Sequence, residues 1–317
     1  MSYTQLTEVK RYQIYTLLNN DFTKKAIAKE VGVHPSTITR EIRRNQGKRG
    51  YRPKQANALA VNRRHGAQKH QRLTDKLKAI IAKHLKQKWS PEQITGYLKR
   101  IGDDRVSHER IYQFIKEDQL SGGTLYKCLR HSHKKRKKRY GGADRRGEIK
   151  NRVSIDERPK IVEKRQRLGD WELDTVIGKN HKGALVTIVD RCSLKTLIKK
   201  VPSKHASVVT AACIEKLAPY ADISSTATAD NGKEFAGHQE VAKAVGIDVY
   251  FAHPYSSWER GTNENTNGLI RQYIPKGSSL EDCDDKYIEF IEEQLNNRPR
   301  KCLGYLTPNQ YFDQMRQ

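Results

Sequence analysis

The sequence predicts a multidomain protein in which all-α helical units precede an α/β domain. Up to about residue 120, apolar residues recur at helical spacing. Beyond about residue 155, short β-branched segments alternate with helical ones. Net charge changes in the same region: residues 1–150 carry +24 and residues 151–317 carry +1. A chain of 317 residues is long enough for two or three small domains with a buried core.

The concentration of positive charge in one half indicates a polyanionic partner, and the helical elements there favour nucleic acid over an anionic membrane. No apolar run approaches membrane-spanning length, and the N-terminus lacks an apolar signal region. The five cysteines are scattered, odd in number and lack C-x-x-C spacing. This pattern indicates a reducing compartment and argues against a structural zinc site. We therefore expect a soluble cytoplasmic protein with no membrane partner.

Residues 1–46 are expected to form a helix-turn-helix DNA-binding domain. A small residue, a turn glycine and an apolar anchor, at Ala28, Gly32 and Ile38, have the spacing of that motif. An ordinary three-helix bundle with a basic face is the alternative. The predicted helices are Glu8 to Leu18, Thr23 to Val31 and Pro35 to Arg44.

The last of these helices carries the residues that favour DNA binding. Short hydroxyls and guanidiniums suit base edges and phosphates. These candidates are Ser36, Thr37, Thr39, Arg40, Arg43 and Arg44.

Residues 47–72 are expected to be a basic linker. The sequence fits either a short helix or a tether in this segment. Residues 73–120 are expected to form a second helical, helix-turn-helix-like DNA-binding domain. Its first helix is predicted over Leu73 to Leu85, and Ser90 and Ser107 are the predicted N-caps of two more. This domain either lengthens the DNA site or serves for packing and dimerisation.

Residues 121–155 form a second basic linker. It contains six consecutive basic residues, which are usually a solvated tail. Between DNA-binding and catalytic parts they would contact phosphates without reading sequence. They are Lys134, Lys135, Arg136, Lys137, Lys138 and Arg139.

Residues 156–317 are expected to form the α/β domain. A meander of three strands comes first, followed by a helix, a strand, a helix and a strand, and by a closing helix. The predicted strands are Trp171 to Ile177, Ala184 to Val189, Thr196 to Val201, Ser224 to Asp230 and Asp248 to Phe251; the helices are Ala206 to Leu217, His238 to Val245 and Tyr287 to Leu295.

Three carboxylates in this domain are candidate metal ligands. Asp174 falls inside the first strand, and Asp230 ends a later strand at an Asn-Gly turn. Glu264 lies in the first turn of a helix predicted from about Asn263, as its cap, to Tyr273. Such hard-oxygen ligands suit Mg²⁺ or Mn²⁺, and a pair of these ions supports in-line displacement at phosphorus. Arg271 lies seven residues beyond Glu264, on the same helix face.

Other acids compete for this site. Glu172 shares the strand face of Asp174, whereas Asp170 precedes the strand proper. Glu259 is expected to be structural and paired with Arg260. Asp190 is expected either to form a salt bridge with Arg191 or to lie near the metals. Glu264 is preferred because a helix fixes a ligand more firmly than a loop.

Sequence motifs in this half resemble the DDE signature of retroviral integrases and bacterial insertion-sequence transposases. They are W-E-L-D-T, T-A-D-N-G-K-E-F and Y-S-S-W-E-R-G-T-N-E-N-T-N-G-L-I-R-Q-Y, with 33 residues between Asp230 and Glu264. R-G-T-N-E-N-T-N-G most resembles the insertion-sequence-thirty family. R-P-x-x-V-E-x-R from Arg158 and the L-T-P-N-Q-Y-F tail also match, so the resemblance covers most of the chain beyond residue 155.

The resemblance implies a ribonuclease-H-like catalytic domain over residues 156–317, with Asp174, Asp230 and Glu264 as the catalytic, metal-binding triad. It implies a transposase that binds the terminal inverted repeats of its element. Cleavage frees a 3′-hydroxyl, which then attacks a second phosphodiester in target DNA; two Mg²⁺ or Mn²⁺ ions are expected. Arg271 and Lys276 would hold the DNA end. Paired cutting at two ends implies a homodimer or larger assembly.

Two other functions are weighed against this one. A helix-turn-helix regulator would explain the charge and the helical units and leave the triad unused. A ribonuclease-H-like nuclease would share the carboxylates without needing two DNA-binding units. Metal-dependent cleavage and a comparison of substrates separate the three.

Overall fold

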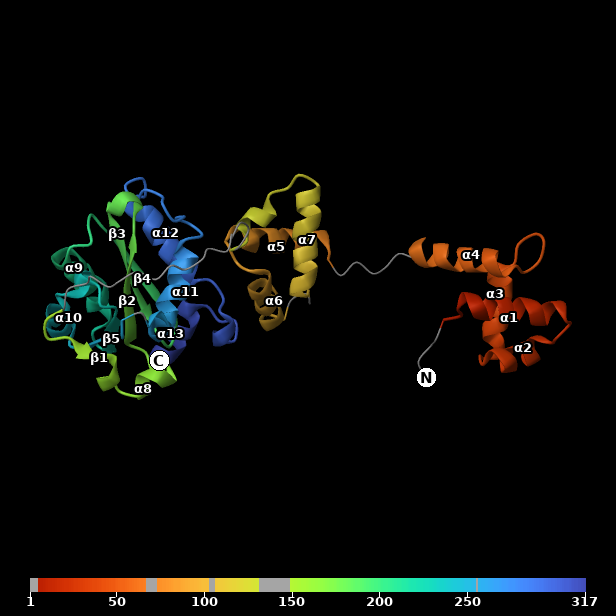
Figure 1. The fold of residues 1–317 in the computed structure, drawn as a ribbon, viewed down its shortest axis with the longest axis horizontal. Helices are drawn as coiled ribbons and strands as arrows, with labels where there is room; N and C mark the ends of the chain where they lie inside the picture. The colour runs from red at the N-terminus through yellow and green to blue at the C-terminus, as the bar shows by residue number, and fades with distance from the viewer. Residues whose placement is uncertain (1–4, 67–72, 103–105, 131–148, 255) are drawn as a thin grey trace. The chain divides into compact units, whose positions relative to one another are not determined.

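The computed structural model of the chain describes residues 5–66, 73–102, 106–130, 149–254 and 256–317 (Figure 1). The chain divides into two compact units, Met1–Gln71 and Arg72–Gln317, each with its own hydrophobic core. Within the described ranges, no helix combines the length and the apolar character needed to cross a bilayer.

The first unit is a bundle of four helices. Threonine hydroxyls cap two of them, because Thr7 and Thr23 accept hydrogen bonds from the amides three residues later. Pro35 begins the third helix, where its missing N–H costs nothing. The helices are α1 (Glu8–Asn19), α2 (Lys24–Val31), α3 (Pro35–Asn45) and α4 (Pro53–Gly66).

Helices α2 and α3 form the predicted helix-turn-helix. Gly32 ends α2 with φ +67°, a left-handed conformation that a side chain would strain. The Val33 amide donates to the Ala28 carbonyl and closes the turn. Ala28 and Ile38 are almost fully buried where the helices meet.

Helix α4 makes this unit larger than the three predicted helices. It packs against α1 and α3, although within it only Pro53 and Ala56 are buried. Such small apolar residues give a weak helical pattern, so the sequence does not distinguish a helix from a tether in this segment. Its Arg63 donates to the Arg44 carbonyl and to Asn45.

The second unit begins with three helices packed around Ile81, Ile94 and Ile111. Ser90 and Gln93 form the predicted capping box, with hydrogen bonds in both directions. The helices are α5 (Asp75–Lys86), α6 (Pro91–Arg100) and α7 (His108–Leu120).

A six-stranded mixed sheet forms the centre of the remaining chain. Strands β2, β3 and β4 are the predicted antiparallel meander, and β5 and β6 add in parallel on the other side of β2. The order is β1-β6-β5-β2-β3-β4. The strands are β1 (Val153–Ser154), β2 (Asp170–Ile177), β3 (Ala184–Asp190), β4 (Thr196–Val201), β5 (Thr226–Ala229) and β6 (Asp248–Phe251).

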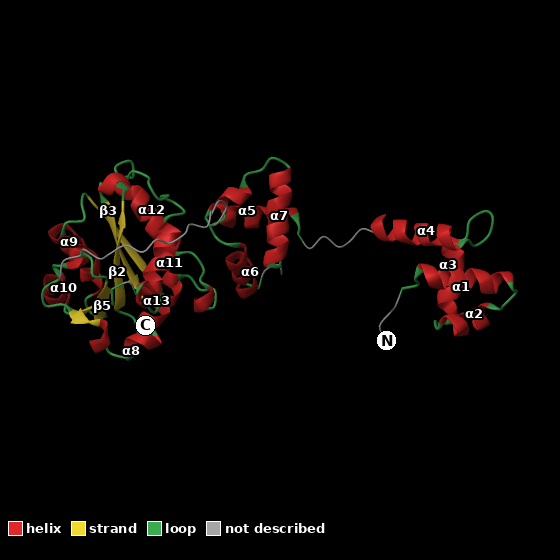
Figure 2. Cartoon of the chain, viewed as in Figure 1, coloured by secondary structure: helices red, strands yellow, loops and turns green. Residues whose placement is uncertain are grey.

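Helices cover both faces of the sheet (Figure 2). One core contains residues of α9 and α10, and the other contains residues of α11 and α12. Because both faces are covered, every residue of β3 is buried. The helices are α8 (Ile161–Lys164), α9 (Ala206–Leu217), α10 (His238–Val245), α11 (Gly261–Ile270), α12 (Asp285–Asn296) and α13 (Pro308–Arg316).

Two predicted boundaries near the site are wrong. Strand β5 ends at Ala229, so Asp230 is the first residue after it. Helix α11 begins at Gly261, without a side-chain cap, because a short 3₁₀ turn over Ser257–Arg260 leads directly into it. Asn263 is therefore a buried residue of the first turn, and the helix ends at Ile270 rather than Tyr273.

Candidate active site

Asp174 and Asp230 lie beside each other because β2, which carries Asp174, and β5, which Asp230 follows, are parallel neighbours in the middle of the sheet. Glu172 in β2 pairs with Thr228 in β5, and the same register continued by two residues puts Asp174 level with Asp230. One Asp174 oxygen accepts from the Thr175 amide at 2.8 Å. Asp230 accepts from the Gly232 amide at 2.8 Å, which fixes the turn after β5.

Arg260 lies across both carboxylates. Its Nη1 is 3.6 Å from Asp174 Oδ2 and its Nη2 is 3.5 Å from Asp230 Oδ2. Nη1 also donates to the Leu173 carbonyl at 3.0 Å, whereas the buried Nε has no hydrogen-bond partner among the described residues. A guanidinium thus occupies a position between two carboxylates, at distances longer than those of close ion pairs.

The pKa of Asp174 is raised to about 6. Burial is the main cause, and the guanidinium of Arg260 opposes it. The Asp230 carboxylate raises this pKa, the Thr175 amide lowers it, and Glu234 adds a smaller increase. Near neutral pH, Asp174 is therefore mainly ionised but close to its titration range.

Among the described residues, no hydrogen bond or ion pair joins Glu264 to Asp174, Asp230 or Arg260. Glu264 lies in the first turn of α11 with its side chain exposed to solvent. Asn267, three residues later, donates to Asp174 Oδ2 at 2.9 Å. Within the described ranges, no group of three or more His, Cys, Asp or Glu side chains is close enough to hold a metal ion. The structure brings together two of the three predicted ligands and leaves the third in solvent on the adjacent helix.

Glu234 is a carboxylate that the sequence analysis did not single out. It lies in the 3₁₀ turn Lys233–Phe235 after Asp230, and it accepts from the Thr175 hydroxyl at 3.1 Å. Its effect on the pKa of Asp174 indicates that it is near that side chain. The motif T-A-D-N-G-K-E-F contained this residue, but a four-residue offset from Asp230 does not reveal a turn that bends back.

The rival acids near β2 are structural. Glu172 is fully buried, pairs with Arg191 at 2.8 Å and accepts from the Asn263 amide. Asp170 pairs with Arg167 through two bonds of 2.8 Å. Each has its oxygens bonded within the fold, so neither is available as a ligand.

Two expected pairings are wrong. Asp190 accepts from the Gly169 and Ser193 amides and from the Ser193 hydroxyl, and Arg191 pairs with Glu172 and Glu163 instead. Glu259 pairs with His253 at 2.8 Å, while Arg260 lies at the aspartates. Both corrections concern adjacent residues that leave the backbone in different directions, which sequence proximity does not reveal.

Comparisons with known proteins agree with this architecture. The helix-turn-helix domain family matches residues 2–45, and the integrase core domain family matches residues 164–257. The chain is 48% identical over 312 residues to the transposase for insertion sequence element IS4351 of Bacteroides fragilis, covering 98% of this chain and 96% of the relative. It is 37% identical over 320 residues to transposase InsI for insertion sequence element IS30A of Escherichia coli K12, covering 97% and 83%.

The chain belongs to the IS30 family of insertion-sequence transposases. It is therefore a polynucleotidyl transferase with a DDE-type, divalent-metal-dependent catalytic domain, joined to helix-turn-helix DNA-binding elements. The catalytic core domain of BIV integrase is a more distant likeness, with 20% identity and a TM-score of 0.36 over 46% of this chain and 95% of that one.

The candidate DNA-binding residues of the transposase are accessible. All six candidates on α3 are exposed or half-buried. Arg40 donates to the Ser36 carbonyl and hydroxyl, so its guanidinium lies along the helix. Arg271 is half-buried and donates to the Ile177 carbonyl, whereas Lys276 is exposed. The basic run Lys134, Lys135, Arg136, Lys137, Lys138 and Arg139 lies outside the described residues.

The segment that follows α7 contacts the catalytic domain of the transposase through Arg130. Arg130 donates twice to Asn265, to its side chain at 2.9 Å and its carbonyl at 3.3 Å. It crosses α11 at Gly268, where a β-carbon would be 2.4 Å from its Nη2. A guanidinium thus lies on the helix that carries Glu264, a contact between distant segments that no motif indicated.

Proposed function

We propose that this transposase binds the terminal inverted repeats of its own insertion sequence and cleaves and joins DNA with Asp174, Asp230 and Glu264. The observation that carries the proposal is the meeting of Asp174 and Asp230 across Arg260, where β5 ends beside the middle of its parallel neighbour β2. Two ionised carboxylates that share one guanidinium carry a net negative charge, so the site attracts a further cation.

The residues fit a divalent metal. The donors are carboxylate oxygens, which suit Mg²⁺ or Mn²⁺, and the fold already accommodates a cationic group between them. Asp174, Asp230 and Glu264 would hold the ions. We expect two ions, because a pair can bind both the attacking and the leaving oxygen of an in-line displacement. When bound, such ions activate the attacking oxygen and stabilise the leaving oxygen at phosphorus.

The chain's own residues would position the DNA and the ligands. Asn267 would orient Asp174 through its 2.9 Å hydrogen bond, and Arg260 would offset part of the negative charge of the two aspartates in the absence of metal. Arg271 and Lys276 would hold the DNA end beside them. The exposure of Glu264 is compatible with a ligand that turns inward only when ions and DNA are present.

The rest of the chain would supply recognition. We assign end binding to residues 1–46, extended by α4, and to the helical domain 73–120, with phosphate contacts from the linkers 47–72 and 121–155. Residues 156–317 would perform the catalysis. Cutting at two ends of one element supports a homodimer or larger assembly that holds both double-stranded ends and the target DNA.

Cleavage and strand transfer of labelled terminal-repeat DNA test the assignment. Asp174→Asn, Asp230→Asn and Glu264→Gln should each lower the rate by on the order of a thousandfold or more, because several kcal/mol of charge stabilisation is lost. End binding by gel shift should persist. Withholding divalent ions from the native protein should have the same result.

The matched comparison is between Glu264→Gln and Glu234→Gln. Glu240→Gln, an exposed carboxylate of α10, serves as the control and should retain native activity. If Glu264→Gln is fully active and Glu234→Gln is dead, the third ligand is Glu234 and the assignment is wrong.

A further inference from the structure

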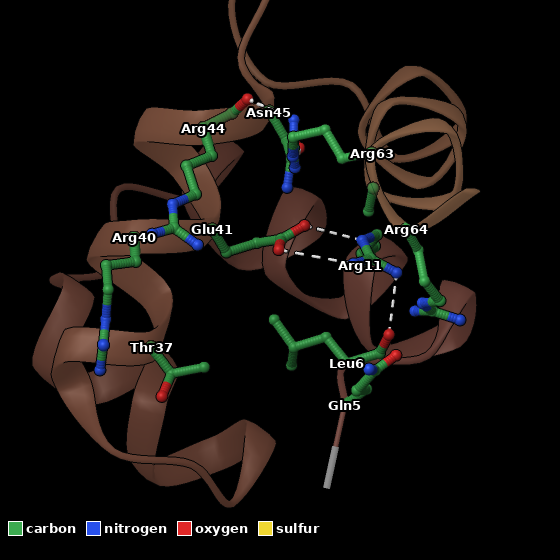
Figure 3. A pocket seen from close by; sticks show the side chains of 11 residues that line it. Gln5, Leu6, Arg11, Thr37, Arg40, Glu41, Arg44, Asn45, Arg63 and Arg64 are labelled. Carbon is green, nitrogen blue, oxygen red and sulfur yellow. Dashed lines mark hydrogen bonds and ion pairs between the residues drawn. The ribbon is translucent and has the colours of Figure 1, made fainter. Parts of the chain in front are cut away.

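A cleft of about 410 Å³ lies between helices α3 and α4 of the first unit (Figure 3). Thr37, Arg40 and Arg44 line it from α3, and Arg63 and Arg64 line it from α4. The helix-turn-helix family match ends at residue 45, so the α4 side of the cleft lies outside the part of the chain which that family describes.

The floor of the cleft is a closed ion pair. Arg11 Nε donates to Glu41 at 2.7 Å, and the Tyr51 hydroxyl donates to the same carboxylate at 3.2 Å. Arg11 Nη1 uses the Leu6 carbonyl and the Asn57 side chain. Burial, with the Glu41 charge, raises the pKa of Tyr51, which keeps it a neutral donor. The floor therefore carries no net charge.

The rim of the cleft is cationic. Arg40, Arg44, Arg63 and Arg64 line it, and Glu41 is the sole carboxylate among its lining residues. Arg63 is fixed by the Arg44 carbonyl and Asn45. Arg44 and Arg64 are exposed on facing helices, and in the part of the chain described neither forms an ion pair. Figure 3 shows the Arg44 and Arg64 side chains on opposite sides of the Arg11–Glu41 pair. Guanidiniums that border a neutral floor in this way attract the phosphate oxygens of a polyanion.

We propose that this cleft binds the DNA backbone, with Arg44 and Arg64 donating to phosphates from its two sides and α4 lying along the DNA beside the helix-turn-helix. The proposal rests on DNA binding by the first unit and adds a site to it. The second helix of such a motif enters the major groove, so groups flanking it face the phosphates that border the groove. Arg64 of α4 and Arg44 of α3 would hold the register of the protein on DNA without reading sequence.

Charge-removal variants of the full chain test the site. Arg44→Gln and Arg64→Gln should each raise the Kd several-fold, equally for a terminal-repeat duplex and a scrambled duplex of the same length. A plot of log Kd against log salt should lose about one unit of slope per contact removed. Arg64→Lys should restore the slope and only part of the affinity, because a single ammonium does not form a bidentate contact.

Lys54→Gln is the matched control, since it removes one positive charge from an exposed position of α4 that does not line the cleft. It should leave the slope unchanged. If Arg64→Gln matches Lys54→Gln, or weakens the terminal repeat alone, the cleft is not a phosphate site. If the native protein binds both duplexes equally, terminal-repeat recognition fails while the phosphate site is still tested by the slopes.

Discussion

Two arginine–carboxylate groups in this chain differ in a way that separates structure from function. In the first unit, Arg11 and Glu41 are 2.7 Å apart, and Tyr51, Asn57 and Leu6 complete their hydrogen bonds. In the second unit, Arg260 is 3.5 and 3.6 Å from two aspartates, and its Nε has no hydrogen-bond partner within the described ranges. We therefore expect the closed group to stabilise the fold and the open one to exchange its cation for a metal ion.

The largest effect of this difference is on stability. Glu41→Gln leaves the Arg11 guanidinium buried without a counter-charge, so the first unit should lose about 3–5 kcal/mol of unfolding free energy. Urea unfolding of the full chain, monitored by circular dichroism, should show an early transition. Glu30→Gln, at an exposed site of α2, should match the native protein. A native-like Glu41→Gln would show that this pair stabilises nothing.

The next effect is on pH dependence. Without metal, the pKa of Asp174 is raised to about 6, so below that pH protons compete with a metal ion for this carboxylate. At a metal concentration too low to saturate the site, cleavage should fall by up to about tenfold per pH unit below about 6. Stability has the opposite sign, since the metal-free fold should lose stability as pH rises from 3.8, the ordinary pKa of an aspartate, to about 6, and change little above that. Rates between about pH 5 and 8 and metal-free melting temperatures between about pH 4 and 7 check both, and a flat rate profile would contradict the titration of Asp174.

The smallest effect is expected from Arg260→Gln. Arg260 is buried, but the side chains of Asp174 and Asp230 remain 22% and 30% exposed and can be hydrated once the guanidinium is removed. The free energy of unfolding should therefore change by about 1 kcal/mol, less than for Glu41→Gln. The pKa of Asp174 should rise further, because the guanidinium lowers it. Carbon-13 NMR titration of aspartate carboxyls measures this shift. A stability loss as large as that of Glu41→Gln would place Arg260 among the structural arginines.

The sequence predicts the order of most helices and strands, though not β1, α8 or α13, because local signals determine them. Ser90 with Gln93, Gly32 and the apolar alternation of β2 each act over a few residues. The sequence does not distinguish helix α4 from a tether, because the residues that α4 buries have small side chains. The path of the 3₁₀ turn before α11 was also missed, since no cap residue marks it.

The site was predicted in part for the same reason. The parallel pairing of β2 and β5 brings Asp174, in the middle of β2, level with Asp230, just after β5, as the motif resemblance implied. Arg260 and Asn267 were missed as their partners, because side-chain direction depends on how α11 packs against β2 and β3. Glu234 depends on a turn after β5 that bends toward Thr175. These contacts join residues that are 30 apart in the sequence, for Asp230 and Arg260, to 93 apart, for Asp174 and Asn267, and local patterns do not encode them.

The most direct test of the proposed triad is the position of Mn²⁺, measured by anomalous scattering from crystals of the transposase bound to its terminal-repeat DNA. We expect ions ligated by Asp174, Asp230 and Glu264, with Arg260 displaced from between the aspartates. Ions ligated by Glu234 while Glu264 stays in solvent, or no ion at Asp174 and Asp230, would contradict the assignment.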